Sequence, residues 1–183
     1  MNKTLSYFWE LVKIFFIALV IVLPIRYFLF QPFIVRGDSM IPSFSSGDYL
    51  IIDEISYRFS DPQRGDVIVF RYPKNPTQRF IKRIIGLPGE TVEIKDGEIT
   101  VYNKQGQKQI LDETIYLPNA KAITYGNLQV VLGEDEYFVL GDNRTYSSDS
   151  RTWGPLPREN IIGKVFLRIF PLATLEKITS PSY

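Results

Sequence analysis

A strongly apolar segment lies near the amino terminus, from Leu11 to Phe30, and its charged residues are Lys13 and Arg26. About 20 residues that rise 1.5 Å each in a helix can cross a hydrocarbon layer about 30 Å thick. The pattern therefore predicts an N-terminal membrane anchor at residues 1–33, with a transmembrane helix at about residues 11–30. A cleaved signal peptide and a buried helix of a soluble protein are the alternatives. No small-x-small cleavage site follows the segment, which favours a retained anchor.

After this anchor, short runs of β-branched and aromatic residues are bounded by Gly, Pro and Asp, a pattern typical of strands. The clearest case is Val92–Tyr102, where Asp96-Gly97 between two alternating stretches predicts a two-residue hairpin. No later stretch has sustained helical periodicity. The predicted fold class is therefore mainly β, with a β-rich domain at residues 34–183 and strands expected at 48–53, 66–72, 136–143 and 161–170.

One part of the β-rich domain departs from the strand pattern. Residues at about 104–130 are more polar and irregular than their surroundings. We expect them to form a small insertion or subdomain on the β core. A domain of about 150 residues can bury about two-thirds of the surface that its unfolded chain exposes, so a core of useful size is available.

The composition excludes several common mechanisms, because the 183 residues include no Cys and no His. Disulfides, a thiol nucleophile, a Cys-based zinc site and a Ser-His-Asp triad are all ruled out. A hydrolase with this composition must take its general base from Lys, Asp, Glu or Tyr, or use a metal held by oxygen ligands. The net charge of +1 argues against a nucleic-acid binder, which usually has a marked basic excess.

The first segment with candidate chemistry is "GDSMIP", which contains Ser39. Gly37 permits a positive φ and Pro42 restrains the chain soon afterwards, so Ser39 is expected on a constrained bend. Such a bend can expose a hydroxyl beside free backbone N–H groups. Taken alone, the segment also fits an ordinary turn, and Arg36-Gly37-Asp38 spells the adhesion tripeptide of integrin ligands.

The second segment is "QRFIKRIIGLPGE", which contains Lys82. In a strand, Lys82 and Arg83 point to opposite faces, and the neighbours on both faces are largely apolar. At least one of the two cations is therefore expected to point toward buried surface. Burial lowers the pKa of a lysine and makes its neutral amine available as a base. A lysine at a strand edge with its amine in solvent is the alternative.

The third segment is "GDNRTYSSDSRTWG", at residues 141–154. Two Asp and two Arg alternate with hydroxyl side chains before a Trp-Gly pair. The pattern fits a solvated surface loop, and it fits equally an ion-pair and hydrogen-bond network that holds other groups in place.

Together, these segments resemble the type I signal peptidases, which are membrane-anchored serine proteases with a Ser/Lys dyad. The resemblance covers nearly the whole chain. It is carried by "GDSMIPS" after an N-terminal anchor, "GDVIVF", "RFIKRIIGLPGE", "LGDNRTYSSDSRTWG" and the closing "GKVFLRIFP", in the order and approximate spacing of the family.

The resemblance implies roles for individual residues. Ser39 would be the nucleophile and Lys82 the general base, which agrees with the absence of His. Gly37 occupies the oxyanion position at which some members have a serine hydroxyl, so a main-chain donor or a water would have to assist the N–H of Ser39. The third segment would supply the support residues: Ser147 to orient the lysine amine, Asp149 with Arg151 as an ion pair, and Asp142 and Arg144 as structural support.

The resemblance also implies substrates and surroundings. Family members cut after a small-x-small pattern, commonly Ala-x-Ala, and the expected partners are the signal peptides of secretory preproteins and the lipid bilayer. The expected enzyme is a single-pass protein of the plasma membrane with its catalytic domain on the extracytoplasmic side, a monomer that needs no metal or organic cofactor. We expect the substrate pocket to include Val35, Met40, Phe80 and Ile81, and an apolar rim at the membrane to include Met40, Ile41, Pro42 and Phe44.

Two alternatives from other classes stay open at this point. One is a membrane-tethered β scaffold or binding protein without catalysis. The other is a self-cleaving regulator related to the SOS-response repressors, which use a similar Ser/Lys pair. Those regulators carry an N-terminal DNA-binding module, whereas this chain begins with an apolar segment and has almost no net charge.

Overall fold

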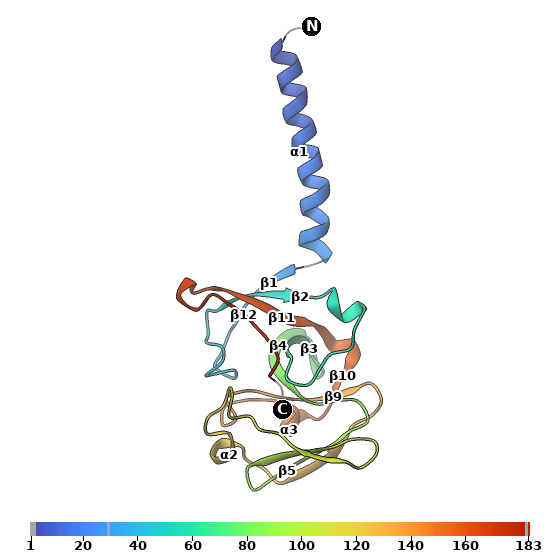
Figure 1. Cartoon of the computed structure of the whole chain (residues 1–183), viewed down its shortest axis with the longest axis vertical. Coiled ribbons are helices and arrows are strands. Elements are labelled where there is room, and N and C mark those ends of the chain that lie inside the picture. Colours follow the sequence, from blue (N-terminus) through green and yellow to red (C-terminus); the bar gives the residue numbers. More distant parts are fainter. Residues whose placement is uncertain (1–2, 29, 182) are drawn as a thin grey trace.

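A long helix, α1 (Lys3–Phe28), extends away from a β-rich body (Figure 1). The computed structural model describes the backbone of residues 3–28, 30–181 and 183, and the side chains of residues 7–20, 31–181 and 183. A helix therefore lies where the sequence predicts one, although residue 29 falls outside the described part. Within the described residues, no helix combines the length and the apolar character that a membrane crossing requires. Whether α1 spans a membrane stays a prediction.

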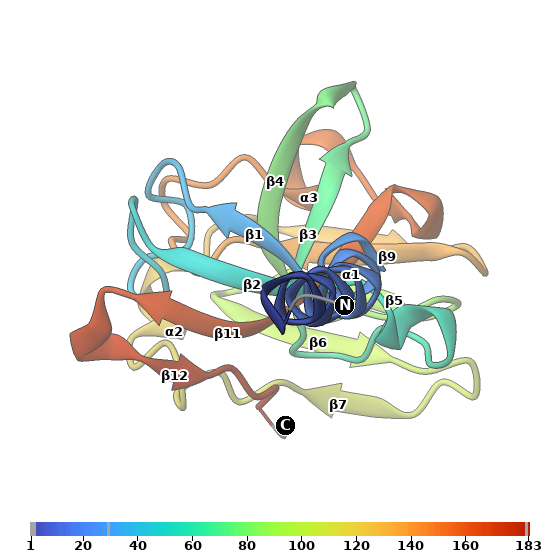
Figure 2. The same cartoon turned by 90° about the horizontal axis from the view of Figure 1, so that it is seen from above.

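The larger of the two sheets contains the first and the last described strands of the β-rich body. Its described strands follow the order β1-β2-β11-β3-β4-β9-β10, and β12 pairs with β11. Neighbouring strands are antiparallel, as expected for strands joined mostly by hairpins and loops. The strands are β1 (Phe30–Ile34), β2 (Tyr49–Asp53), β3 (Val67–Tyr72), β4 (Asn75–Gly86), β9 (Glu136–Leu140), β10 (Leu156–Pro157), β11 (Ile161–Phe170) and β12 (Glu176–Lys177). Seen from above, the β3–β4 hairpin reaches out past the other strands (Figure 2).

A second sheet is inserted between β4 and β9, with the order β7-β6-β5-β8. Its strands are β5 (Thr91–Lys95), β6 (Glu98–Tyr102), β7 (Lys108–Ile110) and β8 (Leu128–Val131). The predicted hairpin is confirmed as β5–β6, with positive φ at Asp96 and Gly97.

The inserted unit begins earlier than the predicted insertion at residues 104–130. That segment supplies β7 and β8, but both strands pair with the preceding hairpin, β8 with β5 and β7 with β6. The sequence pattern separated these strands because it records polarity and not pairing. The hairpin and the polar segment are therefore parts of one sheet.

The apolar side chains of the body form three clusters. The first cluster lies between the Ser39 bend and strands β3 and β4. The second packs the strands of the second sheet against residues of β4 and β9. The third lies on the other face of β3, β4 and β9. After α1, the described helices have at most four residues, in agreement with the lack of helical periodicity in the sequence. They are η1 (Ser56–Arg58), α2 (Ala120–Ile123), α3 (Ser150–Trp153), η2 (Arg158–Asn160) and η3 (Leu172–Thr174).

Candidate active site

Ser39 and Lys82 meet across the larger sheet, although 43 residues separate them in the chain. Lys82 lies on β4 opposite Ile68 of β3, and Ser39 lies on the bend between β1 and β2. The Nζ of Lys82 donates to Ser39 Oγ at 2.7 Å and to the carbonyl of Ile81 at 2.7 Å. A nucleophile and its base need this hydrogen-bond distance for direct proton transfer.

The environment of Lys82 favours its neutral form. The side chain is buried, with 3% of the residue exposed. Burial lowers the pKa of Lys82 from its ordinary value of 10.5 to about 8, while the charges of Asp149 and Asp142 act in the opposite direction. About a tenth of the amine is then neutral at pH 7, compared with about 4 parts in 10,000 for an unperturbed lysine. The amine is thus available as a base close to neutral pH.

The bend that carries Ser39 is held from two sides. Gly37 has φ +87°, in the region that favours glycine, and its N–H donates to Ser46 Oγ at 3.3 Å. From the opposite side, Asn143 donates from its backbone N–H to the Ser39 carbonyl at 3.0 Å and from Nδ2 to the Asp38 carbonyl at 2.9 Å. These contacts restrain the main chain on both sides of the hydroxyl.

The loop at residues 141–151 packs directly against this bend. A Cβ on Gly141 would lie 2.4 Å from the Ser39 carbonyl oxygen and 2.2 Å from Ser147 Oγ, so the close approach requires glycine. The buried Asp149 accepts from the Gly141 N–H at 3.1 Å. It also forms two hydrogen bonds of 2.8 Å with the Arg151 guanidinium. This ion pair fixes the loop under the nucleophile.

Ser147 makes no hydrogen bond to the amine of Lys82 in this structure, although the family resemblance implies that Ser147 orients this amine. Within the described residues, its Oγ is buried without a hydrogen-bond partner. The Lys82 amine uses Ser39 Oγ and the Ile81 carbonyl instead. Ser147 is therefore close to the Ser39 bend, through Gly141, but it makes no hydrogen bond there.

Asp142 and Arg144 form buried ion pairs away from the dyad. Asp142 accepts from Arg83 Nε at 2.9 Å and from Nη2 at 2.7 Å. Arg144 bonds the carboxylate of Glu113 at 2.7 and 2.5 Å. Arg83, Glu113 and Asn143 were not predicted from the sequence as site residues. Arg83 follows Lys82 and could have been suspected, whereas nothing local distinguishes Glu113 within the polar segment.

A groove of about 530 Å³ opens beside the dyad and is lined by residues from the β1 end, the Ser39 bend, β4 and the 141–151 loop. Phe80 and Ile81, two of the residues predicted for the substrate pocket, line this groove, and its role as the pocket stays a prediction. Val35 and Met40 instead belong to the buried core beneath the bend, where they pack with Ile81. Their apolar side chains gain more by burial in the core than at the groove wall.

The predicted apolar rim is also smaller than expected. Ile41 is exposed and so is Pro42, but Met40 and Phe44 are buried in the core. The bend folds inward after Ser39, with the Phe44 N–H bonded to the Met40 carbonyl at 2.9 Å. The rim prediction was therefore wrong for Met40 and Phe44.

Comparisons with known proteins agree on one family. The model of the family "Signal peptidase, peptidase S26" matches residues 8–170. A probable signal peptidase I-1 of Synechocystis sp. is 38% identical over 174 residues, which cover 89% of this chain and 85% of the relative. The signal peptidase I of Leptolyngbya laminosa is 37% identical over 94% of this chain and 84% of its own. The signal peptidase I V of Bacillus subtilis is 34% identical over 86% and 95%.

Proposed function

The chain belongs to the signal peptidase family, peptidase S26, and on this premise we propose that it is a serine endopeptidase that removes N-terminal signal peptides from exported preproteins. The observation that carries the proposal is the 2.7 Å hydrogen bond between Ser39 Oγ and the buried amine of Lys82, at the edge of a groove. No His is present in the sequence to serve as the base.

In the proposed mechanism, the neutral amine of Lys82 takes the proton of Ser39 Oγ as this oxygen attacks the carbonyl carbon of the scissile bond. The resulting ammonium donates its proton to the leaving amine when the C–N bond breaks. A water molecule then attacks the acyl-enzyme while Lys82 takes its proton. The bond between the acyl carbon and Ser39 Oγ breaks, Lys82 returns the proton to this oxygen, and the new carboxyl end is released. The low pKa of Lys82 supports this cycle, because the attack of Ser39 and the later attack of water both need the neutral amine.

The negative oxygen of the tetrahedral intermediate needs hydrogen-bond donors. We assign the backbone N–H of Ser39 to this role, with a second main-chain donor or a water, because Gly37 has no hydroxyl. An added Cβ at Gly37 would meet no atom within 4 Å, so there is open space at this position, and Gly37 is one of the residues that line the groove.

Two strand edges support binding of the substrate as an added strand. Within the described residues, β1 pairs with β2 on one side, and the part of β4 before Lys82 pairs with β3 on one side. Both β1 and β4 line the groove. An extended peptide between these edges would bring its scissile bond to Ser39. Cleavage after a small-x-small sequence is the specificity that the family resemblance implies.

We also propose that α1 anchors the enzyme in the plasma membrane with the β-rich body on the extracytoplasmic side. The described side chains of α1 support this proposal. Tyr7, Phe8, Trp9 and most residues to Val20 are exposed in the isolated chain, and a membrane would cover these apolar groups. Tethering would raise the encounter rate with membrane-inserted signal segments. The catalytic unit of this proposal is a monomer, because both residues of the dyad come from one chain.

The proposal is tested by following cleavage of a membrane-inserted precursor with an Ala-x-Ala site. We expect Ser39→Ala and Lys82→Ala to fold, by thermal melts, and to lose cleavage by at least about 1,000-fold, because removing either member of such a dyad disables the other. Lys95→Ala, at an exposed position on the second sheet, is the matched control and should cut normally.

The alternatives give other results. A folded Ser39→Ala variant that cuts at the wild-type rate contradicts the dyad. A folded wild type that cuts nothing favours the scaffold. A wild type that shortens only itself, seen as a mass change on incubation, favours the self-cleaving regulator.

A further inference from the structure

A buried network joins the inserted unit to the site, and it is centred on Glu113 and Tyr116, which lie between β7 and β8. We call these two residues the clamp. Glu113 is 4% exposed and its carboxylate binds both terminal nitrogens of the Arg144 guanidinium, while the hydroxyl of Tyr116 donates to the same carboxylate. Arg144 is 2% exposed and also donates to Thr124 Oγ1 at 2.8 Å.

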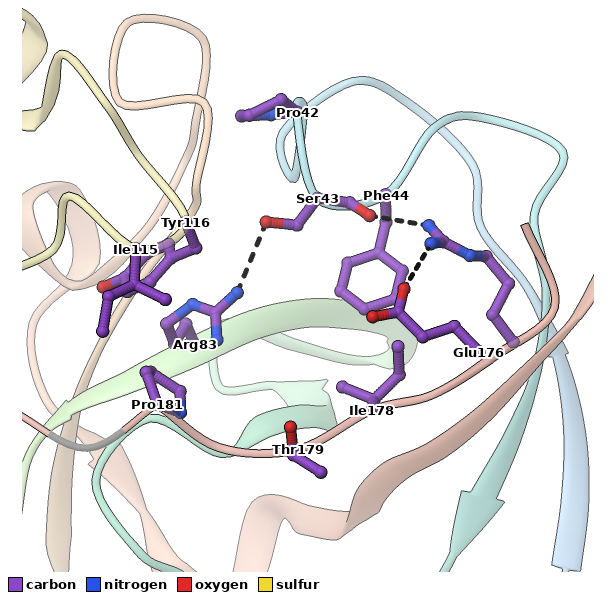
Figure 3. Close-up of a pocket in the computed structure, with 11 residues that line it drawn as sticks. Pro42, Ser43, Phe44, Arg83, Ile115, Tyr116, Glu176, Ile178, Thr179 and Pro181 are labelled. Atoms are coloured by element: carbon purple, nitrogen blue, oxygen red, sulfur yellow. Dashed lines mark hydrogen bonds and ion pairs between the residues drawn. The ribbon is translucent and has the colours of Figure 1, made fainter.

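The other member of the clamp contacts the second arginine. The guanidinium of Arg83 lies 3.9 Å from the centre of the Tyr116 ring, a cation–π distance. Figure 3 shows Tyr116 beside Arg83, with Ser43 on the far side of Arg83. Arg83 Nη2 reaches Ser43 Oγ at 3.4 Å, and Nη1 donates to the Gly65 carbonyl at 3.0 Å.

Both arginines lie one step from the dyad. Arg83 follows Lys82 on β4, so contacts that restrain its side chain also restrain the part of the strand that carries the amine. Arg144 Nε donates to the Gly141 carbonyl at 3.0 Å, and the Arg144 carbonyl accepts from Arg151 at 2.7 Å. The loop that Arg144 holds is the one that packs against the Ser39 carbonyl through Gly141.

The charges in this network are costly unless each finds a partner. Burial opposes the charge of Arg144, but the hydrogen bonds and the charge of Glu113 raise its pKa. For Arg83 the charge of Asp142 does the same. Apolar side chains of similar size can often replace a buried ion pair without loss of stability. We therefore expect the buried ion pair of Glu113 and Arg144 to contribute more to the relative orientation of the inserted unit and the 141–151 loop than to the free energy of unfolding.

From these contacts we infer that Glu113 and Tyr116 are positioning residues for the reaction: by binding Arg144 and Arg83 at once, they hold the lysine strand and the loop under Ser39 in one arrangement. This inference rests on the proposed peptidase function. Neither residue lines the groove beside the dyad, so their loss is expected to lower kcat and to leave KM nearly unchanged.

The pH profile distinguishes positioning from simple loss of folded enzyme. The charges of Asp149 and Asp142 raise the pKa of Lys82 against the effect of burial. We expect loss of the clamp to let these carboxylates move away from the amine, and Glu113→Gln also leaves the buried charge of Arg144 without its carboxylate partner. Both changes lower the apparent pKa of the base. A purely structural defect would reduce activity equally at every pH and leave the midpoint of the profile in place.

The experiment compares Glu113→Gln and Tyr116→Phe with two matched controls in the full-length chain in detergent micelles. The controls are Glu93→Gln and Tyr102→Phe, which break a Tyr-to-Glu hydrogen bond of 2.8 Å on the second sheet, away from the dyad. With an Ala-x-Ala peptide as substrate, we expect Glu113→Gln to lower kcat about 10- to 100-fold, with a downward shift of the pH midpoint. Tyr116→Phe keeps the ring and should cost about fivefold. The controls should match the wild type.

Each outcome bears on the inference. A folded Glu113→Gln variant with wild-type kcat and pH midpoint overturns it, as does a loss of kcat without a shift of the midpoint. If Glu113→Gln does not fold, the double variant Glu113→Leu, Arg144→Met removes both charges; it should fold and still show the loss, and full activity overturns the inference. A folded Ser39→Ala variant that still cuts, or a folded wild type that cuts nothing, contradicts the peptidase proposal itself. The inference about Glu113 and Tyr116 then fails as well.

Discussion

At the scale of single residues, the site depends on a lysine in an environment that does not suit its charge. Lys82 is enclosed by the sheet and the 141–151 loop, and water does not solvate its amine as it would at a strand edge. Asp149 and Asp142 limit the effect but do not cancel it, because their carboxylates are committed to Arg151 and Arg83. The same burial that makes the amine a base therefore costs stability.

This cost predicts the pH dependence of unfolding. The pKa of Lys82 is about 8 in the folded chain and 10.5 ordinarily, so between these values the unfolded state holds more protons and stability rises with pH. We expect Lys82→Met to be more stable than the wild type at pH 7, by on the order of 2 kcal/mol. The advantage should shrink as the pH rises from 8 to 10.

Urea unfolding at several pH values measures this difference, with Lys95→Met as an exposed control that should show no such trend. An advantage of Lys82→Met that stays constant over the whole pH range would contradict a lowered pKa.

At the scale of elements, the site lies beside two strand edges that pair with no other strand in the described part of the chain. β1 and the first part of β4 belong to the same sheet but are separated in its order by β2, β11 and β3. Residues of both strands nevertheless line one groove together with Ser39 and Lys82. Unpaired N–H and carbonyl groups on such edges favour a peptide strand as the ligand.

Binding by strand addition predicts sensitivity to the substrate main chain. A peptide with one methylated backbone nitrogen in the three residues before the cut should raise KM about fivefold, because it loses one hydrogen bond to a strand edge. Steady-state kinetics measure the effect. Methylation six residues after the cut is the control and should change KM little. Equal effects at both positions would mean that the strand edges do not bind the peptide main chain.

At the scale of the whole molecule, the helix and the β-rich body are distinct parts. α1 extends from the body at the start of β1 (Figure 1), and the three apolar clusters contain no described residue of α1. The body thus has its own core, while the exposed apolar side chains of α1 have no cover within the described chain.

This division predicts separable contributions of the two parts. A chain without residues 1–28 should keep the thermal midpoint of the body within about 4 °C, since it loses few packed contacts, and should cut a soluble peptide at nearly the full rate. Its cleavage of a membrane-inserted precursor should fall by about 100-fold because the tether is gone. Equal loss on both substrates would show that α1 supports the body and not the encounter with the membrane.

The local features of this protein could be predicted from short stretches of its sequence. Alternating residues around Asp96-Gly97 were sufficient for the β5–β6 hairpin, and the apolar segment was sufficient for a helix, because both depend on neighbours in the chain. The motifs around Ser39 and Lys82 indicated the family, which the comparisons confirm. The catalytic roles of these two residues stay a prediction until they are tested.

The contacts between side chains that are distant in sequence depend on the complete fold. In the fold, Val35 and Met40 are buried in the core, and Ser147 makes no hydrogen bond to the Lys82 amine. The fold also brings Glu113 of a polar loop to Arg144, 31 residues further along the chain. Such contacts depend on strand pairing between segments far apart in sequence, and on the need of every buried charge for a partner. Neither requirement leaves a local pattern, so the positions of these side chains follow from the folded sheet and not from the order of residues.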